Sequence, residues 1–450
     1  MSAPAPASAL ADTGDVNLIE ALGVAIEAAD KGSRVVWQSV EKRRTAAAAA
    51  ATFSTTSPLA AHDATPNEAA TNLVAQHDQQ CGDTIMRILR QYSEGVQREA
   101  PHIRFAFIAK ALHSSTPLSD CYTWVVDHLD GAVSFAHGLP DCSISIGLTY
   151  RKQPVLAVVF TPFISSGVRL TVAAAAMLNV VQQQQQRQQM TLSPTSSPAA
   201  AAVPAAPSGS AGVAPITLTG ASKTKILEES GSPAATAMVL PPTPPFPSSL
   251  RTAAAAASPQ AAPTITHSTP SVVPECNGEL FTAIRGFGAF VNGRQIRVNA
   301  KAAPTTSVVA FNYPRGVELS PSEATSPDSA ALRQRKHNAA IDCSVAMRVE
   351  LLRSPVAALR SYGSCVTTLA QVAAGRVDVC LEPSAKAWDL CAGSLLVTEA
   401  GGYVCNMLGK PLDIAHDTTI VAAATHEMAE LMTETCVRHD FGRHWLLDKE

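Results

Sequence analysis

Two aspartates stand close together at the end of an apolar stretch, immediately before a glycine. The pattern from Trp124 to Gly131 predicts a strand that places Asp127 and Asp130 in a glycine turn. Two carboxylates at a strand end, with the free backbone carbonyl of Leu129 between them, suit a hard cation that prefers oxygen ligands. An aspartate pair before glycine also serves as a turn and helix cap. The pair by itself leaves both interpretations open.

A second acidic motif lies in the C-terminal part of the sequence, where Asp389 precedes a run of small residues. This pattern predicts a helix whose first turn leaves backbone amides and the positive end of the helix dipole open to an anion. Simple N-capping by Asp389 is the alternative. A third small-residue helix start, formed by Gly363, Ser364 and Cys365, could receive a phosphate or hydroxyl group.

The elements that must position these residues follow from hydrophobic periodicity. Helical spacing predicts helices at 16–44, 79–92, 364–374 and 389–399, and an extended loop at 45–66. Apolar and alternating runs predict strands at 105–108, 123–127, 143–150, 155–160, 280–284, 307–312, 377–381 and 403–407, with a hairpin turn at Asn292 and Gly293. Strands that alternate with helices in the C-terminal half predict an α/β lobe.

The composition changes between residues 164 and 275. An alanine run and a glutamine tract precede repeated proline, serine, threonine and alanine. Such a segment cannot bury enough apolar surface to offset its ordering entropy, so it is predicted to be a disordered low-complexity insertion, although it could host a partner motif. The chain is therefore predicted to contain the first part of an N-terminal α+β lobe at 16–163, the insertion at 164–275, the rest of that lobe at 276–345, and a C-terminal α/β lobe at 346–450.

Charge and cysteine usage narrow the class of protein. A net charge of −3 and a pI near 6.5 give no electrostatic footprint for nucleic acid or an anionic membrane, so small molecules or proteins are the expected partners. No run approaches the about 20 apolar residues of a membrane span. The ten cysteines are scattered without a two-residue spacing, which favours free thiols in a reducing compartment. The first residues match neither a secretory signal nor a transit peptide. We expect a soluble, cytoplasmic protein.

Together and in this order, the motifs resemble the inositol monophosphatase family. Residues 123–135 are similar to the first family signature, 388–402 to the second, and 281–298 to a family hairpin. The resemblance implies an α/β (α+β) fold, a layered αβαβα sandwich of two lobes, which the long insertion interrupts here. It also implies a homodimer and Mg²⁺ ions bound where the lobes meet. The implied substrate is a small phosphorylated molecule of the inositol phosphate kind.

The resemblance also implies roles for the acidic residues. Asp127, Asp130 and Asp389 would ligate one Mg²⁺ ion, and Asp127 and the carbonyl of Leu129 would face a second. Asp78 is similar in position to an early aspartate of the family that helps to organise metal-bound water, and is the candidate catalytic residue.

The substrate-binding residues implied by the resemblance lie in three segments. Gly131 and Ala132 follow the first motif, and Gly363, Ser364 and Cys365 form the second segment. Glu382 lies seven positions before Asp389 (389 minus 382), as does the family glutamate that hydrogen-bonds inositol hydroxyls. A solvated acid at a strand end is the alternative interpretation of Glu382.

The sequence departs from the family where water is activated. In the family, a metal-ligating glutamate and a threonine deprotonate that water, but Lys110 and Ala132 stand in their places, and His128 replaces a proline. Lys110 could lie where the charge of one ion would be, or a shortened loop could carry it into solvent.

Two hypotheses about function follow. One is an impaired Mg²⁺-dependent hydrolase of a small phosphomonoester such as myo-inositol monophosphate. The alternative is an inactive homologue that binds a phosphorylated ligand or a partner subunit and regulates it.

Overall fold

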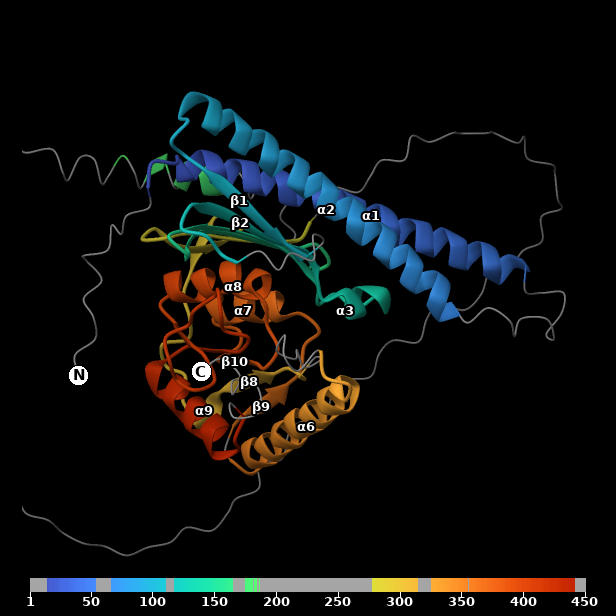
Figure 1. Ribbon diagram of the computed structural model, residues 1–450, viewed down its shortest axis with the longest axis vertical. Coiled ribbons are helices and arrows are strands. Elements are labelled where there is room, and N and C mark those ends of the chain that lie inside the picture. The colour runs from blue at the N-terminus through green and yellow to red at the C-terminus, as the bar shows by residue number, and fades with distance from the viewer. Residues whose placement is uncertain are drawn as a thin grey trace, which may run out of the picture. The chain divides into compact units, whose positions relative to one another are not determined.

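The computed structural model describes residues 14–53, 66–110, 117–164, 175–180, 182–183, 186, 277–314, 325–354 and 356–441 (Figure 1). All of its described elements belong to one compact unit, formed by residues 1–193 and 271–450. Most of the predicted insertion lies outside the described residues. None of the described helices is long and apolar enough to cross a membrane.

A seven-stranded sheet carries the first acidic motif. Its strands follow one another in chain order: β1 (Phe105–Ala109), β2 (Tyr122–Asp130), β3 (Ser143–Tyr150), β4 (Gln153–Thr161), β5 (Glu279–Ile284), β6 (Gly288–Val291) and β7 (Arg294–Ile296). Only β1 and β2 are parallel; the other neighbours are antiparallel. The strands β4 and β5 pair from Leu156 with Ile284 to Thr161 with Glu279. The segments on either side of the predicted insertion are therefore neighbours in one sheet.

A five-stranded sheet forms the second lobe. Its order is β11 (Tyr403–Cys405), β12 (Ile420–Ala423), β10 (Val379–Glu382), β8 (Val308–Phe311) and β9 (Ala358–Arg360). The central strand β10 is parallel to β8 and antiparallel to β12. All four residues of β10 are buried, so Glu382 reaches the end of a strand in the interior of this lobe.

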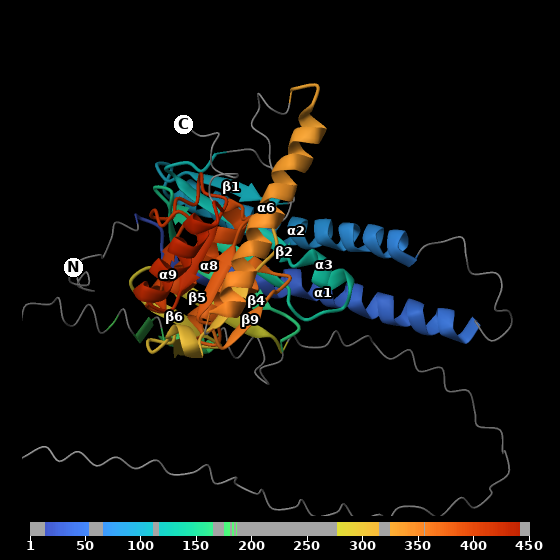
Figure 2. The same ribbon diagram turned by 90° about the horizontal axis from the view of Figure 1, so that it is seen from below.

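Helices cover the outer faces of both sheets and fill the space between them. The helices α1 (Leu18–Phe53) and α2 (Pro66–Glu99) run side by side over the first sheet (Figures 1 and 2). The helices α7 (Cys365–Ala373) and α8 (Ala387–Glu399) lie between the sheets, and α6 (Ser329–Arg353) and α9 (His426–Arg438) cover the second sheet. The short α3 (Ala132–Ala136) follows β2, and η2 (Pro304–Thr306) precedes β8. This arrangement confirms the layered αβαβα sandwich.

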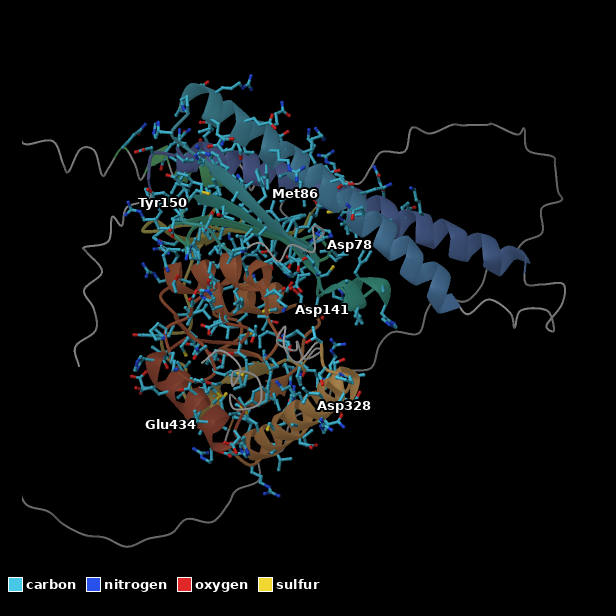
Figure 3. All side chains as sticks on the ribbon, viewed as in Figure 1. Asp78, Met86, Asp141, Tyr150, Asp328 and Glu434 are labelled. Carbon is cyan, nitrogen blue, oxygen red and sulfur yellow. The ribbon has the colours of Figure 1, made fainter. Side chains whose placement is uncertain are left out.

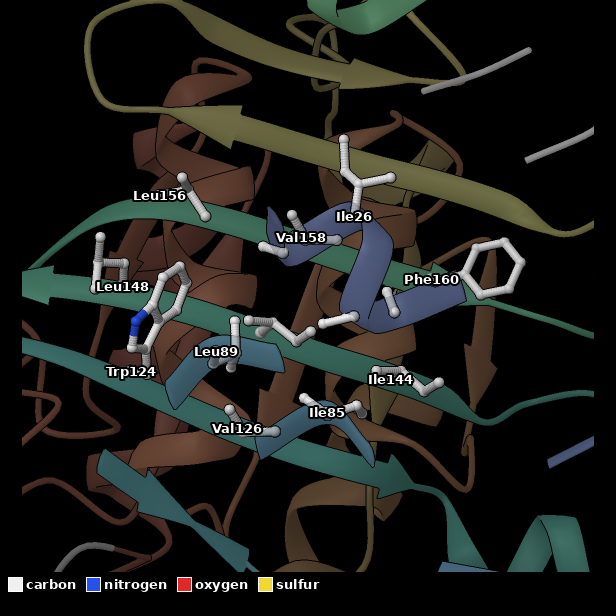
Figure 4. Packing of buried hydrophobic residues seen from close by; sticks show 14 of the residues in the cluster. Ile26, Ile85, Leu89, Trp124, Val126, Ile144, Leu148, Leu156, Val158 and Phe160 are labelled. Atoms are coloured by element: carbon white, nitrogen blue, oxygen red, sulfur yellow. The ribbon is translucent and has the colours of Figure 1, made fainter. Parts of the chain in front are cut away.

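Each interface between layers has its own apolar core. Ile26, Leu89 and Trp124 lie between the two N-terminal helices and the first sheet (Figure 4). The middle core joins this sheet to α7 and α8, and the third joins the second sheet to α6 and α9. The site described below lies at the middle interface, where β2 meets the first turns of α7 and α8.

Several predicted boundaries differ from the structure, two of them at the edges of the segments expected to lack packed structure. The loop expected at 45–66 is replaced in part by longer helices, since α1 continues to Phe53 and α2 begins at Pro66. The alanines after position 45 have the highest intrinsic helix propensity, which the sequence interpretation did not weigh. Residues 175–180 are helical, and Met177 is fully buried in the first core, so some packed structure lies beyond position 164.

Candidate functional site

Three aspartates from distant parts of the chain meet at the junction of the lobes. Asp127 and Asp130 come from the end of β2, and Asp389 lies in the first turn of α8. One carboxylate oxygen from each lies within 4.8 Å of the others. Asp127 and Asp130 are buried. Burial raises the pKa of Asp389 well above its usual value, and the charges of Asp130 and Asp127 raise it further. Such a cluster needs a cation to offset its repulsion.

A β-bulge turns both aspartates of β2 to one face. Asp127 pairs with Ser145 and Asp130 with Ser143, so β2 advances three residues while β3 advances two. Without the extra residue, side chains three positions apart would point to opposite faces of the sheet. Gly131 then reverses the chain at φ 81°, and a Cβ there would lie 2.5 Å from the carbonyl oxygen of Asp141. Glycine is therefore required at this turn.

The first turn of α7 orients Asp130. Ser364 Oγ donates a hydrogen bond of 2.6 Å to Asp130 Oδ2, and the amide of Val366 donates one of 2.8 Å to the same oxygen. Ser364 is also the N-cap of α7, where its Oγ accepts from the amide of Thr367. One serine thus stabilises the start of the helix and fixes the direction of an aspartate from another strand.

Asp389 also has two roles. Its Oδ2 accepts a 2.8 Å hydrogen bond from the amide of Lys386 as part of a capping box at the start of α8. Its carboxylate nevertheless belongs to the three-aspartate cluster. Capping and participation in the site, which were alternatives at the level of sequence, occur together because the two oxygens of a carboxylate can serve different partners.

The ammonium group of Lys110 contacts three oxygens of the first acidic motif directly. Its Nζ lies 3.1 and 3.0 Å from Asp127 Oδ1 and Oδ2, and 2.9 Å from the carbonyl oxygen of Leu129. Burial alone would lower the pKa of Lys110, but the charges of Asp127, Asp130 and Asp389 outweigh it and raise the pKa. Lys110 is therefore a protonated ammonium group. The interpretation that places this lysine in solvent does not agree with the geometry.

Asp78 lies on α2 and contacts His128 (Figure 3 labels Asp78). Asp78 Oδ1 and His128 Nε2 are 2.8 Å apart, so the carboxylate and the imidazole ring are in direct contact. His128 is buried, and its carbonyl accepts from the thiol of Cys81. The sequence interpretation identified His128 only as a replaced proline and missed this pair, because no local pattern connects the two residues.

Glu382 is buried rather than solvated. Its Oε2 accepts a 2.8 Å hydrogen bond from Asn312 Nδ2, and its Oε1 accepts one of 3.2 Å from the amide of Ser384. Asn312 in turn uses its own Oδ1 to accept from the amide of Tyr362, which stands before Gly363. The network links the end of β10 to the segment that leads into α7.

Asp141 fixes the turn before α7, although sequence reasoning did not identify it (Figure 3 labels Asp141). Its Oδ2 accepts from the hydroxyl of Ser134 and from the amide of Gly363. A Cβ at Gly363 would lie 1.8 Å from Ser134 Oγ, so this contact requires glycine. The following Cys365 is fully buried, and burial raises the pKa of its thiol well above the usual value. Cys365 is thus a neutral packing residue in the first turn of α7.

A pair of matched substitutions separates the two roles of Ser364. Ser364→Ala and Thr425→Ala each remove a side chain that caps a helix, in α7 and α9 respectively. Each loss should cost about 1 kcal/mol of unfolding free energy. Only Ser364→Ala also removes a donor to Asp130, so it alone should weaken Mg²⁺ binding measured by calorimetry. Equal Mg²⁺ affinities in the two variants would contradict the orienting role of Ser364.

The chain is similar to known proteins in sequence and in structure. A sequence profile described as the Inositol monophosphatase family matches residues 20–214 and 260–440. The Nus factor SuhB of Xylella fastidiosa is 35% identical over 37% of this chain and 54% of its own length. Inositol monophosphatase 2 of Homo sapiens is 31% identical over 38% of this chain and 53% of its own. The chain thus spans about half the length of these two relatives. A solved structure of inositol monophosphatase from Anabaena is 18% identical, with a TM-score of 0.47, and covers 94% of this chain and 97% of that one.

Proposed function

The chain belongs to the inositol monophosphatase family, and we propose that it binds a small phosphomonoester, such as an inositol monophosphate, and hydrolyses it only weakly. The binding half of this proposal rests on the acidic cluster at the junction of the lobes and on the glycine-rich turns beside it. The weak hydrolysis rests on Lys110. In this proposal the protein is a homodimer, as its resemblance to the family implies, and it is cytoplasmic, as its scattered cysteines favour.

The observation that carries the proposal is the position of the Lys110 ammonium group. It contacts both oxygens of Asp127 and the carbonyl of Leu129, the atoms that would face a second ion in the family arrangement. An ammonium group attracts a phosphate, but it cannot accept a proton from water. Ala132 has no hydroxyl group to assist, and the carboxylate of Asp78 is paired with His128. The groups implied for activating water are thus absent or engaged elsewhere.

One Mg²⁺ ion fits the residues that remain. Asp127, Asp130 and Asp389 offer the oxygen ligands that this ion prefers. Asp130 and Asp389 each use Oδ2 for a hydrogen bond to the protein, which leaves Oδ1 for an ion. A bound Mg²⁺ would polarise the phosphoryl group and offset its charge. The protein's own donors, Ser364 and the amides of Val366 and Lys386, hold the carboxylates in place.

The ligand would contact the turns around the cluster. Gly131 and Ala132 begin α3, and Gly363, Ser364 and Cys365 lead into α7, so both segments lie beside Asp130. We propose that they contact the phosphate or a hydroxyl group of the ligand, Cys365 through its backbone because its side chain is buried. We propose that Glu382, which accepts hydrogen bonds from Asn312 and Ser384, also contacts a hydroxyl group of the ligand. The alternative function is that of an inactive homologue that binds a phosphorylated ligand or a partner subunit and regulates it, and it is distinguished by the absence of turnover.

Parallel measurements of binding and turnover test the proposal. With a panel of sugar and inositol monophosphates at millimolar Mg²⁺, we expect saturable binding by calorimetry and little phosphate release. Asp130→Asn should abolish the binding, because it removes a charge from the cluster. Binding without any turnover would favour the regulatory alternative. A turnover equal to that of the human inositol monophosphatase 2, assayed alongside, would refute the weak-hydrolysis proposal.

A further inference from the structure

We infer that the Lys110 ammonium group is a built-in replacement for one divalent cation, so this site takes one Mg²⁺ ion where the family arrangement implies two. The inference rests on the proposed function only in taking the three-aspartate cluster as a metal site. It concerns the number of ions and does not depend on the identity of the phosphorylated ligand.

The contacts of Lys110 exclude a second ion on its side of Asp127. All three oxygens around its Nζ are 2.9–3.1 Å away, which is within the range of N–H···O hydrogen bonds. A Mg²⁺ ion that used the same oxygens would lie about 2.0–2.1 Å from each of them. The ammonium group and the ion cannot share that space, so the residues present do not fit the second ion.

The charge of the site also indicates that it binds one Mg²⁺ ion. Metal ligation requires the aspartates to be ionised, and three ionised aspartates with one ammonium group sum to −2 (−3 plus 1), which one Mg²⁺ ion neutralises. A second ion would leave a charge of +2 inside a largely buried cluster before any ligand arrives. The glutamate implied by the family resemblance carries −1, and Lys110 carries +1. The exchange therefore changes the site by two units of charge, which is the charge of one Mg²⁺ ion.

The β-sheet explains how this lysine reaches the site. The parallel register of β1 and β2 pairs Phe105 with Tyr122 and Ala109 with Val126. The same spacing of 17 residues, continued by one position, places Lys110 beside Asp127 (127 minus 110). Asp127 is fully buried, while 33% of the Lys110 side chain is exposed. The lysine is thus more exposed than the aspartate, and its ammonium group contacts both carboxylate oxygens of Asp127.

Counting bound ions in the absence of phosphate tests the inference. Calorimetric titration with Mg²⁺ should give one site per chain for the native protein and two for Lys110→Glu. Lys301→Glu, the same substitution at an exposed lysine outside the site, should still give one. Because no phosphate is present, a failure of ligand binding would not affect this count.

If Lys110→Glu does not fold, the number of bound ions can be measured spectroscopically with a second variant, Lys110→Met. With Mn²⁺ as the probe, the native protein should give the electron paramagnetic resonance spectrum of an isolated ion, whereas Lys110→Met should show a coupled pair at saturation. Two ions in the native protein would overturn the inference. A single ion in both Lys110 variants would overturn it as well, because the lysine would then not be what excludes the second ion.

Discussion

Turnover of inositol monophosphate at millimolar Mg²⁺ should rise at least about a hundredfold in the double variant Lys110→Glu with Ala132→Thr. Positioned proton transfer is worth about a hundred to ten thousandfold in rate, and the double variant restores two groups that act on one water. The glutamate also removes the ammonium group from Asp127 and Leu129. The gain should exceed the product of the two single gains, since groups that share one water are coupled. Initial rates of phosphate release are the measurement.

The pair formed by Asp78 and His128 sets a limit on this gain. Asp78 and His128 lie 2.8 Å apart, and neither substitution in the double variant changes these residues, so we expect the Asp78 carboxylate to stay in contact with His128 rather than organise water. His128 lies inside the bulge between Asp127 and Asp130, where β2 has no ladder partner on β3. A proline is therefore compatible with this position, and adding His128→Pro should raise turnover further. The control for the double variant Lys110→Glu with Ala132→Thr is Lys301→Glu with Ala132→Thr, which introduces the same glutamate outside the site. A double variant that binds a second ion but gains no rate would contradict this account of the missing base.

The acidic cluster was predictable from the sequence because each part of it is local. The pair Asp127 and Asp130 lies at one strand end, and Asp389 lies in the first turn of one helix; the resemblance implied that they meet, and their carboxylate oxygens lie within 4.8 Å of one another. The bulge that turns both β2 aspartates to one face was not visible, since it depends on the pairing with β3. The layered fold was predictable for a similar reason: period-2 and period-3.6 patterns are local signals.

The contacts of Lys110 and His128 depend on tertiary structure. Lys110 could be placed near an ion by the resemblance, but its bond to Leu129 requires the parallel register of β1 and β2. His128 meets Asp78 only because α2 packs over β2, and no sequence spacing encodes that contact. Glu382 looked equally suited to solvent, since a strand end does not reveal whether Asn312 lies beside it.

Lys110→Met should destabilise the protein in EDTA by about 2–3 kcal/mol. Removing one partner of a buried ion pair costs about 3–5 kcal/mol because the other charge stays buried, and the partial exposure of Lys110 reduces this cost. Asp127 is fully buried and would lose the nearest cation, while Asp130 and Asp389 would continue to repel it. Methionine keeps most of the apolar stem, so the loss of charge dominates the effect. Urea unfolding followed by circular dichroism measures the change.

Magnesium should reverse that loss, because a divalent ion can enter the space that the ammonium group leaves. Saturating Mg²⁺ should therefore stabilise Lys110→Met by more than it stabilises the native protein, through ion binding to the folded state alone. Lys301→Met, at an exposed lysine, should remain within about 0.5 kcal/mol of the native protein under both conditions. If Lys110→Met were as stable as Lys301→Met in EDTA, the ammonium group would not be compensating Asp127. If Mg²⁺ stabilised the native protein and Lys110→Met equally, the lysine would not be standing in for an ion.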